Sequence, residues 1–120
     1  MKENILKNKS YKFSIRIVKL YKYLCKEHKE YVISKQILKS GTSVGALVRE
    51  TEFAQSKLDF VNKLSIALKE ANETIYWVDL LYETNYINLG MYKSMKSDIK
   101  EILSILVISI KTSKNNLNKK

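Results

Sequence analysis

Cys25 and His28 are the two residues of this chain best suited to chemistry, and they stand three positions apart. On a helix that spacing puts a thiol and an imidazole on one face, where they could share a metal ion. A structural zinc site needs four ligands, however, and the chain has one cysteine and one histidine. The same shortage leaves nucleophilic catalysis without a Cys–His or Ser–His–Asp set. We therefore expect no metal, no cofactor and a cysteine beside a helix-terminal histidine.

Two further spacings invite a test. A di-iron site in a helical bundle needs two Glu-x-x-His pairs, which a chain with one histidine cannot supply. The Gly-x-x-x-Gly segment from Gly41 to Gly45 lacks the Lys-Ser/Thr that completes a phosphate-binding loop. Both results favour a protein that binds rather than one that catalyses, so we predict that it is not an enzyme.

Charged residues also gather in the middle of the chain. We expect a polar network that fixes packing register or satisfies an interface, and a ligand site is the alternative. Its candidate members are Arg49, Glu50, Glu70 and Glu73.

The net charge of +10 is concentrated at the two ends. Residues 1–39 hold eleven Lys/Arg against three acids, whereas residues 40–110 hold seven against nine. Such a field attracts polyanions such as RNA or DNA, although a merely solvated lysine surface is the alternative. Tyr23 lies among these cations and either stacks on a base or packs against lysine stems. The candidate phosphate contacts are Lys12, Arg16, Lys19, Lys22 and Lys26.

Long helices must position these residues. The chain has no proline, only three glycines and 45% hydrophobic residues, which argues against a β-sandwich or barrel. Apolar residues recur at 3–4 spacing, most regularly from Val61 to Tyr82. We predict an all-α, up-down-up-down four-helix bundle over residues 10–113, with a basic N-terminal extension at 1–9 and a disordered basic tail at 114–120. The first three helices are expected at residues 10–28, 31 or 34 to 52, and 56–82. A link over residues 83–89 precedes the last helix, which runs to about residue 113.

Helix ends and close contacts carry their own signals. Ser56 and Asp59 form a capping-box pattern, and Asn85 and Asn88 are the expected C-cap and N-cap of the last connection. Two glycines inside the second helix, Gly41 and Gly45, indicate that another backbone passes close by, or else a local kink.

Apolar residues also lie off the predicted core stripes. A monomeric bundle needs one apolar stripe per helix, so the surplus predicts a homo-oligomer, with singly scattered surface hydrophobic residues as the alternative. The candidate interface residues are Tyr11, Ile15, Val18, Ile66, Trp77, Leu80, Ile105 and Ile108.

The remaining patterns bear on location. The N-terminal residues do not resemble a signal peptide, and the most apolar window, Ile102–Ile110, is shorter than the roughly 20 residues that span a bilayer. A single cysteine is compatible with a reducing compartment. We expect a cytoplasmic protein that does not contact membranes.

Residues 34–46, 54–60 and 63–74, followed by Tyr76 and Trp77, carry a family resemblance. The chain resembles a bacterial four-helix-bundle family named for proteins encoded in intervening sequences of large-subunit ribosomal RNA genes. It is similar, more distantly, to the accessory protein of diversity-generating retroelements. The resemblance implies a ring-like homopentamer with no catalytic residues. Its retroelement branch implies a basic surface that associates with nucleic acid and a reverse transcriptase. Many members begin the second helix after a proline, which this chain lacks.

Two functions remain in competition at this point. The first is a nucleic-acid-binding oligomer, with RNA favoured, and the second is a scaffold that binds a protein partner while its lysines only solubilise it. A bundle that binds a small molecule or a metal ranks last.

Overall fold

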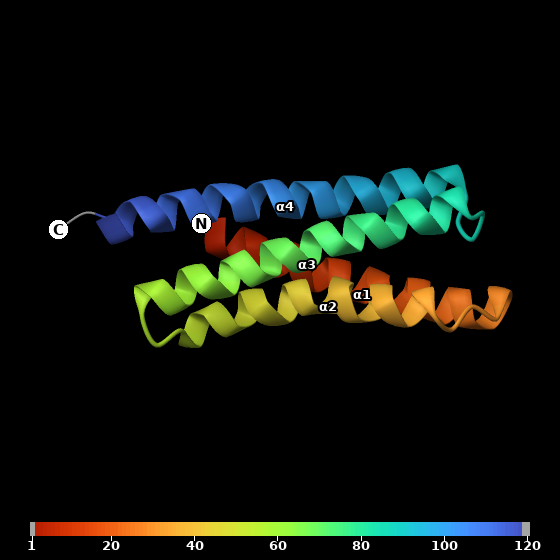
Figure 1. The fold of residues 1–120 in the computed structure, drawn as a ribbon, viewed down its shortest axis with the longest axis horizontal. Coiled ribbons are helices and arrows are strands. Elements are labelled where there is room, and N and C mark those ends of the chain that lie inside the picture. Colours follow the sequence, from red (N-terminus) through yellow and green to blue (C-terminus); the bar gives the residue numbers. More distant parts are fainter. Residues whose placement is uncertain (1, 119–120) are drawn as a thin grey trace.

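Four helices form an antiparallel bundle in which each helix reverses the direction of the one before it (Figure 1). The computed structural model describes residues 2–118. The bundle measures 54 × 22 × 20 Å. Its helices are α1 (Lys2–His28), α2 (Ile33–Glu50), α3 (Lys57–Glu83) and α4 (Leu89–Asn118), with a 3-10 turn over Thr51–Phe53. The predicted all-α, up-down-up-down bundle is confirmed.

The helices sit at the corners of a square. α2 packs closely on both α1 and α3, and α4 packs closely on α3, whereas α1 and α4 touch much more sparsely. α1 therefore lies diagonally opposite α3. The side chains of the predicted stripes fill the centre, and the largest fully buried ones include Phe13, Ile17, Leu24, Ile37, Leu64, Ile99, Ile102 and Leu106.

Both outer ends of the bundle differ from the prediction. α1 begins at Lys2 rather than near residue 10, because Leu6 and Ser10 are buried and continue the stripe of Phe13. The sequence pattern did not predict this continuation, because serine is polar and is not expected at a core position. α4 runs on to Asn118 with no helix-breaking residue after Ile110, so most of the predicted tail is helical. Residues 119 and 120 of that tail lie outside the described part.

The predicted N-caps are present. The Ser56 Oγ accepts a hydrogen bond from the backbone N–H of Asp59 at 3.0 Å. The Asp59 carboxylate accepts in turn from the N–H of Gln55 at 3.0 Å, one residue earlier than a standard capping box requires. The C-cap of α3 is Thr84 rather than the predicted Asn85, and Asn85 follows it with a φ of 69°, the left-handed conformation usual one residue after a C-cap. The Asn88 Oδ1 accepts from the N–H of Met91 at 2.8 Å and so caps α4.

The glycines of α2 let α1 approach closely, as two glycines inside a helix predicted. A Cβ on Gly45 would lie 3.1 Å from the backbone oxygen of Ser10. A Cβ on Gly41 would lie 2.7 Å from the Cγ1 of Ile17, a fully buried side chain. On the other side of α2, the Thr74 and Ser40 hydroxyls hydrogen-bond at 2.9 Å inside the core. The small residues thus set the spacing of α2 from both neighbours.

Candidate nucleic-acid interface

The sparse contact between α1 and α4 leaves a seam, and Arg16 bridges it. The Arg16 guanidinium donates to the carboxylate of Asp98, to the Ser94 hydroxyl at 2.8 Å and to the Ser94 carbonyl at 3.4 Å. Arg16 was predicted to contact phosphate, but the structure pairs its charge with Asp98. Arg16 thus connects α1 to α4 through Asp98 and Ser94.

Further along the seam, Lys9 donates to the Glu101 carboxylate at 3.0 Å. Beside these two ion pairs lie two hollows, because few side chains from α1 and α4 meet. The smaller hollow has a volume of about 140 Å³ and lies near Lys12 and Phe13. The larger one has a volume of about 330 Å³, and its walls are Arg16, Lys19, Leu20, Tyr23, Met91 and Met95.

The other four predicted phosphate contacts remain available. Lys12, Lys19, Lys22 and Lys26 are exposed. None of them forms an ion pair with a carboxylate within residues 2–118. They follow α1 over four turns, so their charges line one side of the bundle.

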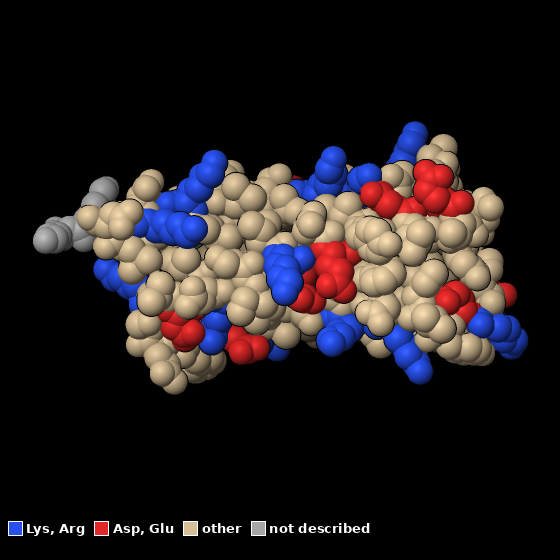
Figure 2. All heavy atoms as spheres, viewed as in Figure 1, with Lys and Arg blue, Asp and Glu red and all other residues tan. Residues whose placement is uncertain are grey.

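The face made by α2, α3 and α4 has a different character. Figure 2 shows basic and acidic groups interspersed there among wide uncharged areas. One cation on these helices, Lys96, donates to the Asp79 carboxylate at 2.8 Å and to the Tyr92 hydroxyl at 2.9 Å. These hydrogen bonds raise the pKa of Lys96 to about 12.

Tyr23 forms one wall of the larger seam hollow. Its hydroxyl lies 3.1 Å from the Nε2 of His28, and the two rings meet edge to face with centroids 5.2 Å apart. His28 also meets the Tyr86 ring edge to face, at 5.4 Å. The histidine thus sits between two tyrosines and orients one of them.

Within the described residues no group of three His, Cys, Asp or Glu side chains lies close enough to hold a metal.

The predicted oligomer residues divide into two groups. Five of them are substantially exposed: Tyr11 (54%), Ile15 (42%), Val18 (37%), Ile66 (49%) and Ile108 (47%). Trp77 and Ile105 are half-buried and pack against the core, and Leu80 is half-buried as well. Sequence periodicity did not separate these groups. It gives the angle of a residue around its own helix, but not whether side chains of a neighbouring helix cover that residue.

The four residues of the predicted polar network, Arg49, Glu50, Glu70 and Glu73, form no ion pair with one another among the described residues. Arg49 lies over the Tyr11 ring at 5.2 Å, toward α1. Glu73 accepts a hydrogen bond from the Trp77 indole at 3.1 Å, on α3 alone. Arg49 is thus directed toward α1, whereas the contact of Glu73 stays within α3.

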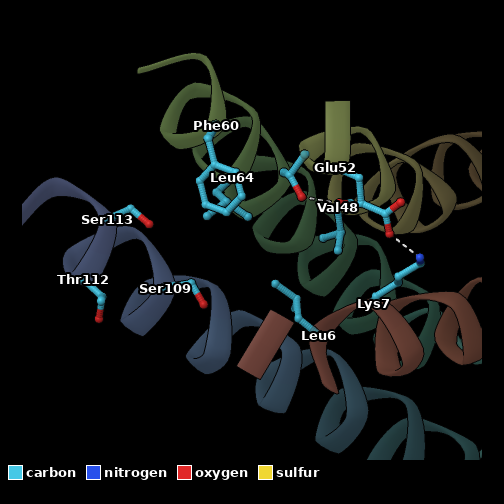
Figure 3. A pocket seen from close by; sticks show the side chains of 10 residues that line it. Leu6, Lys7, Val48, Glu52, Phe60, Leu64, Ser109, Thr112 and Ser113 are labelled. Carbon is cyan, nitrogen blue, oxygen red and sulfur yellow. Dashed lines mark hydrogen bonds and ion pairs between the residues drawn. The ribbon is translucent and has the colours of Figure 1, made fainter. Parts of the chain in front are cut away.

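A third cavity, of about 360 Å³, opens where all four helices come together at the end of the bundle (Figure 3). Leu6, Val48 and Leu64 supply apolar surface, Phe60 lies beside them, and α4 contributes hydroxyls such as Ser109. Lys7 and Glu52 form an ion pair at its edge. The sequence carries no sign of this cavity, because its lining comes from four separate helix ends.

The chain matches the family described as 23S rRNA-intervening sequence protein over residues 2–107. It belongs to that family. A solved structure from Bacteroides thetaiotaomicron, described as a protein of unknown function from the S23 ribosomal protein family, is 58% identical, with a TM-score of 0.91. The alignment covers 92% of this chain and 99% of that one. No curated protein matches the chain.

This member of the intervening-sequence family thus keeps the family's bundle. No helix among the described residues is long and apolar enough to cross a membrane. The seam between α1 and α4 combines a basic rim with two hollows.

Proposed function

We propose that this protein binds RNA without catalysing a reaction, and that the exposed lysines of α1 contact the phosphates. The observation that carries the proposal is the row of Lys12, Lys19, Lys22 and Lys26, exposed and without ion-pair partners in the described chain. At 1.5 Å per residue the row is about 21 Å long, enough to follow several phosphates. The family description names 23S rRNA, and for that reason we choose RNA over DNA.

A homo-oligomer is the second half of the proposal. Exposed apolar residues on three helices, among them Ile15, Ile66 and Ile108, would be covered by neighbouring copies. Each copy would add one lysine row, so a ring would bind a long RNA more tightly than one bundle does. The family resemblance leads us to propose five copies. Light scattering should give a multiple of 14.0 kDa, and a single-chain mass at micromolar concentration would contradict the oligomer.

RNA binding is tested by a salt series with mixed-sequence RNA. Four phosphate contacts per chain predict that log K falls with log[salt] with a slope of about −3, from about −0.7 per contact. The double variant Lys22→Glu/Lys26→Glu should weaken binding and flatten the slope.

The matched control carries the same change of charge on the diagonally opposite helix. Lys57 and Lys69 are exposed on α3, so Lys57→Glu/Lys69→Glu should weaken binding much less. Equal losses in the two double variants would mean that net charge, rather than the α1 row, governs binding. No binding at low salt would remove the proposal.

A protein-binding scaffold is the second candidate. It is favoured by Phe53, which is 81% exposed at the turn after α2 and therefore presents an aromatic ring to solvent. Capture from a host lysate with and without nuclease separates the two functions. A protein partner that stays bound after nuclease treatment and is lost in Phe53→Ser would support the scaffold.

A further inference from the structure

We propose that the larger hollow between α1 and α4 receives one unpaired nucleobase, so that single-stranded RNA is the ligand of this face. The inference rests on the proposed RNA binding and specifies which form of RNA is bound. It is carried by three features of the hollow: a fixed aromatic wall, an apolar floor and cations at its rim.

The two end walls of the hollow are held in place before any ligand arrives. Tyr23 is oriented by the hydrogen bond between its hydroxyl and His28 at 3.1 Å. Arg16 is fixed by Asp98 and by the Ser94 hydroxyl at 2.8 Å. A tyrosine ring and a guanidinium plane are two groups on which unpaired bases stack in RNA complexes. Because both are already ordered, binding a base costs little side-chain entropy.

Arg16 and Tyr23 lie on the same face of α1, seven residues and about 10 Å apart along the helix axis. A base stacked between two planar groups needs about 7 Å, twice the 3.4 Å rise between stacked bases. The hollow is therefore long enough to admit a flat ring, which stacks on one of the two walls at a time. Leu20, Met91 and Met95 form apolar walls between them, and thioether sulfurs make favourable contacts with aromatic rings.

The rim supplies charge for the phosphates on either side of the base. Lys19 lies between Arg16 and Tyr23 and lines the hollow, and it is exposed. The volume of about 330 Å³ is near the lower limit of small-molecule pockets, roughly 300–1,000 Å³, which matches one nucleoside better than two. The Tyr23 hydroxyl and Ser94 hydroxyl are already hydrogen-bonded, so we expect little preference among the four bases.

A base can reach this hollow only when it is not stacked in a duplex. Lysines alone would favour the duplex, since its charge density is higher than that of a single strand. If the protein binds single-stranded RNA more tightly than duplex RNA, the preference must therefore come from base binding in the hollow and not from the lysine row.

The experiment measures the affinity of the full-length protein for three labelled RNA 12-mers by fluorescence anisotropy. The first is single-stranded, the second is a duplex, and the third is an abasic strand that keeps every phosphate. We expect the single strand to bind about 5- to 150-fold more tightly than the abasic strand, the range for stacking of one base. Tyr23→Ala should remove most of that difference, and Tyr23→Phe should keep it.

The matched control is Tyr76→Ala, which removes a tyrosine ring exposed on α3 and should leave the difference unchanged. Circular dichroism of each variant at the assay temperature checks that the bundle is folded. Equal binding of base-bearing and abasic strands, or a difference that survives in Tyr23→Ala, would overturn the inference and leave the proposed RNA binding intact. If none of the three RNAs binds, both fail.

Discussion

Glu30 gives the sharpest test of how this bundle is held together. It is 8% exposed in the connection between α1 and α2, and its carboxylate accepts three backbone hydrogen bonds. The donors are the N–H groups of Val32 at 3.2 Å, Ile33 at 3.1 Å and Ser34 at 2.7 Å. These are first-turn groups of α2 that have no partner within the helix. Glu30 therefore caps α2 from outside it.

The size of the effect follows from what each donor meets when the carboxylate is removed. In Glu30→Ala the N–H of exposed Val32 can turn to water, whereas Ser34 is buried and its N–H would lose its partner. One buried unsatisfied group costs about 1–3 kcal/mol, and the lost charge-assisted bonds add to it. We expect a loss of about 2–3 kcal/mol, or roughly 6–15 °C in Tm for a chain of this length.

The dependence on pH separates a charged cap from simple packing. Burial would raise the pKa of Glu30, but the hydrogen bonds from Ser34, Ile33 and Val32 outweigh it and hold the pKa below its ordinary value. The unfolded carboxyl therefore takes up a proton first, at about pH 4.3. The stabilisation is present above that pH and is lost as the pH falls through the lower, folded pKa.

Urea unfolding followed by circular dichroism at pH 7 and about pH 3, at one protein concentration, measures both effects. Glu30→Gln keeps the side-chain length but not the charge, so its deficit relative to the natural protein should shrink at the lower pH. Glu27→Gln, an exposed neighbour on α1, should lie within about 0.5 kcal/mol of the natural protein. A Glu30→Gln deficit that is the same at both pH values would refute the charged cap.

Three other changes test packing, each by urea unfolding. Gly41→Ala should destabilise the bundle by about 1–3 kcal/mol because its Cβ would overlap the buried Ile17 side chain. Gly90→Ala, whose Cβ meets nothing closer than 3.4 Å, should be neutral or stabilising. If Gly90→Ala lost more stability than Gly41→Ala, the close approach of α1 and α2 would be refuted. Thr74→Val should cost about 1–2 kcal/mol because the hydroxyl of Ser40 loses its buried partner, and an unchanged midpoint would count against that bond. Ser109→Val places two methyl groups toward the end cavity and should stabilise by about 1 kcal/mol, while a loss of stability would mean that the cavity is filled by water.

Local sequence signals predicted the ends of α3 and the start of α4. Ser56 and Asn88 each act through a side chain and a backbone group three residues away, and Asn85 acts through its own left-handed backbone, so a short stretch of sequence contains each interaction. The cap of α2 was missed for a related reason. A glutamate two to four positions before the N–H groups that it binds has no standard pattern, and it works only because Glu30 is buried by the turn.

The sequence by itself determined the class of the fold and the row of cations. Apolar spacing of three and four along a chain without proline commits it to helices with one buried face, and Lys12, Lys19, Lys22 and Lys26 must then lie away from that face. Periodicity measures only the angle from the core. It cannot say which neighbouring helix a flanking side chain meets, because that depends on how four helices pack.

Only the tertiary structure therefore decided that Arg16 is paired with Asp98 and that Tyr23 is held by His28. These contacts join residues from different helices or from a helix and its end. The sequence predicted five equivalent cations on α1, whereas the structure has four exposed lysines and a hollow that Arg16 and Tyr23 line. The physical reason for the hollow is the sparse packing of α1 on α4.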